Sequence, residues 1–436
     1  MLNDTICAIS TSLKEGAISI VRMSGEDSFN IIKEISDIKK IEANTIKYSH
    51  IYDNGEVVDE VLISFFVGPK SYTREDMVEI NCHGGVFVTR MILNLLLSKG
   101  ARLATPGEFT KRAYLNGRID LSEAESGNDL IKATNYLQAK SAIKGVDGSI
   151  EKLLNPIMNE MKNVISMIEV NIDYPEYDDV EIMSNEKVKP YVHKWIEEME
   201  TMIDKASRFR VVKDGIKTVI IGKPNVGKSS LLNALLKQDK AIVTDIAGTT
   251  RDLVEGDVNL DNVSLRLIDT AGIRDSDDKI EQIGIEKSKE ALKEADLVLL
   301  VIDGSNIDEK DEELIKLTEG KKRVIIYNKK DLVKKDGINI SAKDGDIEAL
   351  TSYLNNEYKD DISLVNEDIL NNERQISLMR RALSELKEML KDFDNVSLDV
   401  VMLDLEESFH YLCEILGREY KEDLIDHMFK NFCLGK

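Results

Sequence analysis

A glycine-rich segment in the middle of the 436-residue chain constrains its fold more than any other feature. Residues 222–229 read Gly-Lys-Pro-Asn-Val-Gly-Lys-Ser, after the β-branched run 217–221 and before the apolar run 229–236. These flanking runs are typical of a buried strand and a helix. Glycines let the loop turn its backbone N–H groups inward, and the helix N-terminus adds positive potential. The segment therefore predicts a phosphate-binding loop in an α/β domain.

Two side chains of this loop have predicted roles at a bound nucleotide. Lys228 would reach the β- and γ-phosphates, and the Ser229 hydroxyl would be a ligand of Mg²⁺. Three further motifs follow, each directly after a predicted strand: Asp269-Thr-Ala-Gly272, Asn328-Lys-Lys-Asp331 and Ser341-Ala-Lys343. The first places a carboxylate in the Mg²⁺ shell and a glycine N–H at the γ-phosphate.

The other two motifs predict which base is bound. The Asp331 carboxylate can accept hydrogen bonds from guanine N1–H and from the 2-amino group, and adenine offers neither donor. The Ser-Ala-Lys segment supplies a backbone contact to the guanine carbonyl. Each motif by itself is also an ordinary turn between a strand and a helix. Together and in this order they predict binding of GTP and GDP.

Two positions distinguish this site from that of many small GTPases. Residue 273, directly after the Asp-x-x-Gly motif, is isoleucine rather than the glutamine that orients the attacking water. Asn225, together with the segment 245–252, suggests that a monovalent cation lies beside the phosphates, held by Asn225 and by loop carbonyls. The alternative for Asn225 is a simple turn residue.

Composition favours a cytoplasmic enzyme without membrane contact. The chain has 58 basic and 80 acidic residues, a net charge of −22, which argues against tight autonomous binding to nucleic acid. It shows no signal-peptide pattern at its start and no apolar run of about 18 residues. Four scattered cysteines lack metal or disulfide spacing, which predicts reduced thiols: Cys7, Cys82, Cys413 and Cys433.

Periodicity along the chain predicts a multidomain protein, α/β plus all-α. Strands and two helices are expected in the first part, and long amphipathic helices, including one over 121–143, in the second and fourth parts. A Ras-like GTPase domain is then inserted into one helical domain and preceded by an α+β domain. The expected borders give four segments: 1–118, 119–213, 214–365 and 366–436.

The chain resembles a known GTPase family on these motifs and on its flanks. Residues 248–252 and 269–274 are similar to those of translation-factor-related GTPases of the TrmE-Era-EngA type. The flanks resemble the MnmE (TrmE) family of tRNA modification GTPases over residues 16–25, 79–85, 105–121, 172–175 and 432–436. The resemblance implies a homodimer whose first domain binds a tetrahydrofolate derivative.

The resemblance also implies roles in the nucleotide site. Mg²⁺ ligands would be Ser229 and Thr250, and Glu281 would orient water through an intermediate water, acting in catalysis with Lys228. By its position alone, Glu281 is an ordinary glutamate at a helix start. The implied K⁺ ligands are Asn225, Thr244, Ile246 and Thr249. The full nucleotide-binding set is Asn225, Val226, Gly227, Lys228, Ser229, Ser230, Thr244, Asp245, Ile246, Ala247, Gly248, Thr249, Thr250, Asp269, Thr270, Ala271, Gly272, Asn328, Lys329, Asp331, Ser341, Ala342 and Lys343.

For the folate, 5,10-methylene- or 5-formyl-tetrahydrofolate, the resemblance implies the residues Arg22, Glu79, Arg118 and Lys436. A carboxylate can accept paired N–H bonds from a pterin, and cations can bind the glutamate tail. Isolated residues of these types are otherwise surface ion pairs. Some relatives carry lysine at the position of Arg118. Cys433 is either a thiol near the one-carbon unit or an inert residue.

The function implied by the resemblance is a potassium-stimulated GTP hydrolase. With the flavoprotein MnmG, which carries FAD and uses NADH, it would add a carboxymethylaminomethyl or aminomethyl group to carbon 5 of the wobble uridine of certain tRNAs. The tRNA would be held mainly through this complex, a heterotetramer or larger. One alternative is a ribosome-assembly GTPase switch, whose relatives usually carry a basic RNA-binding module. Another is a folate-binding regulator with an inactive GTPase unit.

Overall fold

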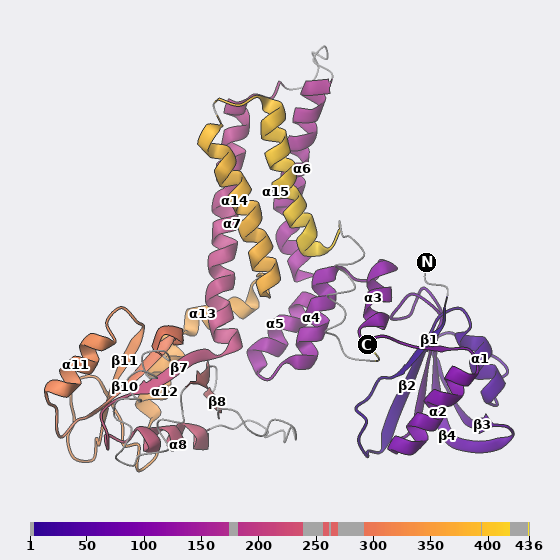
Figure 1. Ribbon diagram of the computed structural model, residues 1–436, viewed down its shortest axis with the longest axis horizontal. Coiled ribbons are helices and arrows are strands. Elements are labelled where there is room, and N and C mark those ends of the chain that lie inside the picture. The colour runs from indigo at the N-terminus through magenta and orange to yellow at the C-terminus, as the bar shows by residue number, and fades with distance from the viewer. Residues whose placement is uncertain are drawn as a thin grey trace. The chain divides into compact units, whose positions relative to one another are not determined.

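The computed structural model describes residues 4–173, 182–238, 256–260, 263–268, 292–393, 395–418 and 435. The chain divides into two compact units, Met1–Asn128 with His410–Lys436, and Asp129–Phe409. Figure 1 shows two sheets with helices against them and a group of long helices. The multidomain fold predicted from the sequence, α/β plus helical, is confirmed. None of the described helices has the length and apolar character needed to cross a membrane.

The first unit contains a six-stranded sheet in the order β3-β4-β5-β2-β1-β6. Its neighbouring strands are antiparallel except for the parallel pair β1–β6. Register places Arg22 of β2 directly opposite Glu79 of β5. The strands are β1 (Ile6–Ile9), β2 (Ile18–Ser24), β3 (Thr45–Asp53), β4 (Glu56–Phe66), β5 (Met77–His83) and β6 (Arg102–Leu103).

Helices cover both faces of this sheet, because side chains alternate along each strand. Cys7 points to the face covered by α1 (Ser28–Ile35) and α2 (Val86–Ser98), whereas Ile6 packs with Phe109 of α3 (Glu108–Leu115). The sequence predicted two helices in this part, and α3 is a third. Three of its five buried residues, Glu108, Thr110 and Arg112, are polar, so it lacks the apolar periodicity that reveals a helix.

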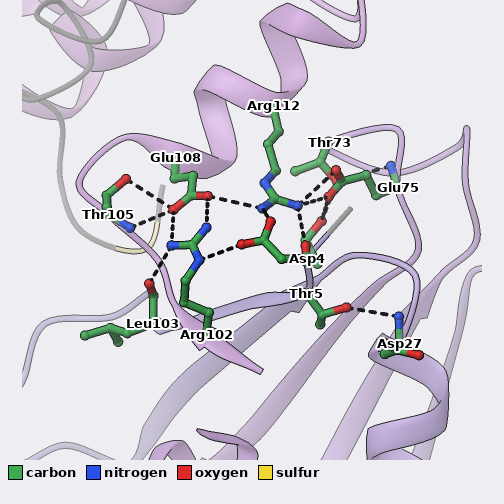
Figure 2. A network of polar contacts seen from close by, with 11 residues as sticks. Asp4, Thr5, Asp27, Thr73, Glu75, Arg102, Leu103, Thr105, Glu108 and Arg112 are labelled. Atoms are coloured by element: carbon green, nitrogen blue, oxygen red, sulfur yellow. Dashed lines mark hydrogen bonds and ion pairs between the residues drawn. The ribbon is translucent and has the colours of Figure 1, made fainter. Parts of the chain in front are cut away.

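A partly buried ion network fastens α3 to the amino-terminal end of the chain (Figure 2). Arg112 of α3, whose side chain is 1% exposed, pairs with Asp4 at 2.6 Å and with Glu75 and Glu108 at 3.1 Å. Arg102 pairs with Asp4 at 2.6 Å and with Glu108 at 2.5 Å. Burial opposes ionisation of Glu108, but the hydrogen bonds from Arg102, the Thr105 N–H and Arg112 together outweigh it and hold the pKa of Glu108 below its ordinary value.

Long helices dominate the rest of the sequence outside the second sheet. Figure 1 shows the four longest side by side. The helices are α4 (Leu121–Lys132), α5 (Tyr136–Val146), α6 (Ser149–Asp173), α7 (Asn185–Asp214), α14 (Glu373–Asp392) and α15 (Leu398–Leu416). The continuous helix expected over 121–143 is wrong, because Asn135 begins a new helix by accepting a hydrogen bond from the Gln138 N–H at 2.9 Å.

The second sheet has the order β12-β11-β10-β7-β9-β8, with only β8 antiparallel to its neighbour. Its strands are β7 (Ile216–Ile221), β8 (Gly256–Leu260), β9 (Val263–Leu267), β10 (Leu297–Asp303), β11 (Arg323–Asn328) and β12 (Ile338–Asn339). Its helices are α8 (Lys228–Gln238), α11 (Glu309–Leu317), α12 (Glu348–Glu357) and α13 (Lys359–Ser363), followed by the 3₁₀ turn η1 (Leu364–Asn366). Because β7, β10, β11 and β12 are parallel, the loops after them meet at one edge.

The carboxyl-terminal part of α7 packs into the hydrophobic core of the second sheet. Phe209 and Val212 of α7 belong to the same buried cluster as Ile216 of β7 and Tyr358. Arg208 of α7 also donates to Asp361 of α13 at 2.6 Å. The chain therefore enters and leaves the inserted domain through packed contacts rather than through an extended linker.

The cysteines that the structure describes are buried and form no disulfide: Cys7, Cys82 and Cys413. Burial raises the pKa of the Cys7 thiol to about 12, so this thiol stays protonated. This agrees with the prediction of reduced thiols for these three residues.

Candidate functional site

The loop between β7 and α8 requires glycine at two positions. A Cβ on Gly222 would lie 2.4 Å from the Val301 carbonyl oxygen. Gly227 has φ +98°, and a Cβ there would lie 2.2 Å from Asn328 Nδ2. Any larger residue would move the loop away from β10 and β11, so the close approach of backbone to neighbouring strands explains both glycines.

Lys228 directs its amine into this loop. Its Nζ donates to the Gly222 carbonyl oxygen at 2.7 Å and to the Lys223 carbonyl oxygen at 2.8 Å. Burial lowers the pKa of Lys228, because the charged amine is removed from water. Ser229, on the first turn of α8, is exposed at the mouth of the loop. The two side chains assigned to phosphate and Mg²⁺ therefore lie where the loop meets the helix.

Asn225 stands at the exposed tip of the loop in a left-handed conformation, with φ 61°. The next residue, Val226, is buried, and its carbonyl oxygen accepts a hydrogen bond from Asn328 Nδ2 at 2.8 Å. Asparagine is one of the few residues besides glycine that adopt this conformation readily. The side chain of Asn225 is therefore exposed, whereas the following residue, Val226, is buried and held by Asn328.

Asn328 joins the three sequence motifs described by the structure. Its Nδ2 binds the phosphate loop at Val226, and its Oδ1 accepts from the Ala342 N–H at 3.0 Å. Its side chain is buried between these two loops. Residues 225–230, 328–331 and 341–343 are thus held together at the carboxyl edge of the second sheet.

The residues expected around the guanine base differ in exposure. Asp331 and Lys343 are exposed, whereas Ser341 is buried and donates to Asp344 at 2.6 Å. Lys329, at φ 65°, forms an ion pair with Asp303 at the end of β10. Burial opposes ionisation of Asp303, but the ion pair with Lys329 and the hydrogen bonds from Ser305 together outweigh it and lower the pKa of Asp303. The sequence analysis missed Asp303, although an acid ending a buried strand at this edge was a usable signal.

A second lysine of the phosphate loop was also missed. Lys223 Nζ lies 2.8 Å from Asp308 Oδ2 and 2.7 Å from Asp311 Oδ2. Hydrogen bonds to Asp308 and Asp311 raise the pKa of Lys223. The pattern Asp308-x-x-Asp311 forms a capping box at the start of α11 and was readable as such. Its contact with the phosphate loop was not readable, because 85 residues separate Lys223 from Asp308 in the numbering.

Part of the predicted nucleotide site lies outside the described residues. This part comprises the predicted K⁺ ligands Thr244, Ile246 and Thr249, the predicted Mg²⁺ ligand Thr250, the predicted nucleotide-binding residues Asp245, Ala247, Gly248, Asp269, Thr270, Ala271 and Gly272, and Glu281. Of the predicted folate residues, Lys436 lies outside as well, and so does Cys433.

Of the other three predicted folate residues, Arg22 and Arg118 lie beside one aromatic ring, and Glu79 pairs with Arg22. Arg22 Nε donates to Glu79 Oε1 at 2.8 Å across adjacent strands. The guanidinium groups of Arg22 and Arg118 lie 5.8 and 4.7 Å from the centre of the Tyr72 ring. Arg22 also lies 5.6 Å from the centre of the Phe109 ring. Tyr72 and Phe109 escaped the sequence analysis, since nothing in their local sequence marks them.

Gly435 lies against the same residues. Its carbonyl oxygen accepts from Arg22 Nη1 at 3.2 Å and from the Ser10 hydroxyl at 3.0 Å. Its φ is +87°, and a Cβ would lie 2.3 Å from the Ile9 carbonyl oxygen. The second-last residue of the chain is therefore fitted tightly to β1 and β2, beside the Arg22–Glu79 pair.

Comparison with protein families identifies two matching profiles. One, described as the MnmE helical domain, matches residues 121–433. The other, described as the GTP-binding protein TrmE N-terminus, matches residues 5–118. The two profiles together span nearly the whole chain.

Curated relatives match over the same length. A tRNA modification GTPase MnmE of Lactococcus lactis is 47% identical over 448 residues, covering 99% of this chain and 98% of the relative. A tRNA modification GTPase MnmE of Streptococcus gordonii is 46% identical over 451 residues, covering 99% of each.

Among solved structures, the G domain of the T. maritima FeoB iron transporter is 25% identical to this chain. It covers 35% of this chain and 99% of its own, with a TM-score of 0.24. That likeness is too weak to add to the description of the fold.

Proposed function

Because the chain belongs to the MnmE family and is a GTPase that acts in tRNA modification, we propose that potassium stimulates its GTP hydrolysis. We further propose that it acts with the flavoprotein MnmG on carbon 5 of the wobble uridine of certain tRNAs. The observation that carries the potassium proposal is the exposed, left-handed Asn225 at the tip of the phosphate loop. A side-chain oxygen held there is available to a cation beside the phosphates.

The proposed nucleotide site combines the three joined segments with the motifs at 244–250 and 269–272. Lys228 binds the β- and γ-phosphates, exchanging its two backbone acceptors for phosphate oxygens. A desolvated amine interacts more strongly with phosphate than an exposed one, because the local dielectric is low. The exposed Asp331 accepts the guanine N–H groups, and Ala342 and Lys343 complete the pocket around the base.

The residues present fit two metal ions. Ser229 lies exposed at the start of α8, where its hydroxyl can be a Mg²⁺ ligand together with Thr250. Asn225 would hold K⁺ together with Thr244, Ile246 and Thr249. When bound, these cations supply positive charge to the phosphates during hydrolysis. Glu281 takes the role of the missing glutamine and positions the attacking water.

The residues around Tyr72 also fit a tetrahydrofolate derivative. Glu79 offers carboxylate oxygens to pterin N–H groups, and Arg22 and Arg118 offer cations to the glutamate tail. Tyr72 supplies an aromatic face at this place, and Gly435, which precedes Lys436 in the sequence, accepts a hydrogen bond from Arg22. The folate would supply a one-carbon unit, and Cys433 is a candidate thiol beside it.

We also propose the assembly in which these sites work. The chain forms a cytoplasmic homodimer that joins MnmG and its FAD in a heterotetramer or larger complex. A net charge of −22 supports a tRNA held mainly through the complex, because phosphate contacts need a basic surface. Within each chain, the domain borders are proposed at 118/119, 213/214 and 365/366.

Nucleoside analysis tests the proposed reaction. Deletion of the chromosomal copy should remove the carbon-5 modification from wobble uridines, as measured by mass spectrometry of digested tRNA. Complementation with the wild-type chain should restore it. A nucleoside profile unchanged by the deletion would favour the ribosome-assembly switch.

Salt exchange tests the potassium proposal separately. GTP turnover of the purified protein is compared in potassium chloride and sodium chloride at equal ionic strength. We expect a sharp loss in sodium, because Na⁺ is smaller than a site built for K⁺. Equal rates in the two salts would remove the cation from the mechanism.

A further inference from the structure

We propose that Lys223 is a positioning residue for Asn225, and that its anchorage on Asp308 and Asp311 sets the response of GTP hydrolysis to potassium. This inference rests on the potassium site proposed above. Lys223 lies within the phosphate loop, two residues before Asn225, whereas Asp308 and Asp311 lie outside the sequence motifs that identified the site.

The side chain of Lys223 is held in place by a buried acid. Lys223 is 12% exposed and Asp311 is fully buried, with their charged atoms 2.7 Å apart. The other oxygen of the Asp311 carboxylate has no hydrogen-bond partner among the described residues. The charge of Asp311 therefore depends on Lys223, and a buried pair of this kind breaks only at high cost.

The anchor belongs to a fixed element. Asp311 Oδ2 also accepts from the Asp308 N–H at 3.1 Å, and Asp308 Oδ1 accepts from the Lys310 N–H at 2.9 Å. These two bonds cap the first turn of α11, which follows β10 at the center of the sheet. Lys223 is thus anchored to the hydrogen-bonded first turn of α11.

The tip of the phosphate loop is supported at two points. On one side stands Lys223, followed by Pro224, whose ring fixes its own φ. On the other side stands Val226, buried and bonded through its carbonyl oxygen to Asn328. Asn225 lies between these two supports, and its left-handed conformation depends on both.

Loss of the first support would act on the cation and the phosphates more than on the guanine. The Lys223 carbonyl oxygen also accepts from the Lys228 amine at 2.8 Å, so the backbone at Lys223 touches the phosphate-binding group as well. The contacts of Asn328 with Val226 and Ala342 do not involve Lys223, so we expect them to persist when Lys223 is altered. Potassium dependence and guanine affinity are therefore expected to separate.

The experiment measures GTP turnover of the full chain against potassium concentration, with choline chloride keeping the ionic strength constant. The test variant is the double substitution Lys223→Met/Asp311→Asn, which removes the anchor without leaving an unpaired buried charge. We expect it to need about tenfold more potassium for half-maximal turnover, the size typical of coupling between contacting residues. Its affinity for GDP, measured by calorimetry, should stay within about threefold of wild type.

Three further variants make the result specific. Lys223→Arg keeps the ion pair and should keep the wild-type potassium curve. Lys310→Met makes the same type of change at an exposed lysine on α11 and serves as the matched control. Asp308→Asn removes one acid of the anchor but keeps the buried Lys223–Asp311 pair. It should raise the potassium concentration needed for half-maximal turnover by about threefold.

The possible outcomes separate this inference from the proposal on which it rests. Wild-type turnover that does not respond to potassium overturns the potassium site and this inference with it. A potassium-dependent wild type with an unshifted curve in the folded double variant, or in Asp308→Asn, overturns the inference alone. If Lys310→Met shifted the potassium curve as much as the double variant, the inference would also be overturned. The shift would then follow from removing any lysine on that surface and not from loss of the anchor.

Discussion

Replacement of Arg112 by methionine would test the ion network that fastens α3 to the amino-terminal end of the chain (Figure 2). The guanidinium is 1% exposed and lies among three carboxylates, those of Asp4, Glu75 and Glu108. It also donates to the Asp4 backbone carbonyl at 2.8 Å. Methionine keeps most of the apolar stem and removes the charge and all of these donors.

The expected cost follows from what each carboxylate retains. Removal of one partner of a buried ion pair costs about 3–5 kcal/mol. Glu108 keeps Arg102 and the Thr105 N–H, at 2.5 and 2.8 Å, and Asp4 is exposed enough to regain water. The loss should therefore lie near the lower end of that range, about 3 kcal/mol of unfolding free energy for the first unit.

Hydrogen exchange followed by mass spectrometry measures this loss within the full chain. Amides of β1, β2 and β5 exchange by opening of the unit, so a loss of about 3 kcal/mol should speed their exchange about 100-fold. The matched control is Arg90→Met on α2, at an exposed arginine of the same unit, where the change should stay within about 0.5 kcal/mol.

Two results would refute this reasoning. One is an Arg112 variant whose exchange matches that of the Arg90 control, since the network would then contribute nothing. The other is faster exchange confined to α3 with β1 unchanged, since the network would then hold the helix alone and not the unit.

Three more predictions follow from the site and the network. Asn328→Ala should lower the stability of the GTPase domain by about 2–4 kcal/mol, because two buried backbone groups lose their partner; unchanged exchange in the phosphate loop and unchanged GDP affinity would contradict this. Glu281→Ala should keep nucleotide affinity, measured with a fluorescent analogue, and lose phosphate release; full turnover would remove the residue from the mechanism. Acidification should destabilise the first unit: folding lowers the pKa of Asp4, chiefly through the Arg102 hydrogen bond, and also that of Glu108. The stability that these two carboxylates contribute is therefore complete above their pKa values in the unfolded chain, about 4. It disappears as the pH falls through their lower pKa values in the folded chain. Thermal unfolding between neutral pH and about pH 3 measures it, and stability that rises on acidification would disprove it.

Local sequence was sufficient for the features that depend on neighbouring residues. The strand and helix around residues 222–229 were predictable because hydrophobic periodicity and glycine placement act over a few residues. The break before α5 was equally local, since Asn135 caps its own helix, and its signal was overlooked.

Contacts between distant residues were not predictable in this way. The ring of Tyr72 under Arg22 and Arg118, and the contact of Gly435 with β1 and β2, depend on how separate segments pack. Sequence gives the type of each side chain but no distance between segments far apart in the chain. The resemblance to known GTPases supplied Arg22 and Arg118, and only the fold brought Tyr72 to them.

The sequence by itself determined that this chain has a phosphate loop and guanine-specific motifs, because those functions reside in short runs of residue types with fixed spacing. Only the tertiary structure decided what holds the loop in place. Lys223 meets Asp311, and Asn328 meets Val226, because the parallel order of β7, β10 and β11 brings their following loops to one edge of the sheet. Burial then makes those few contacts strong, because charges and amides removed from water depend on the partners that the fold provides.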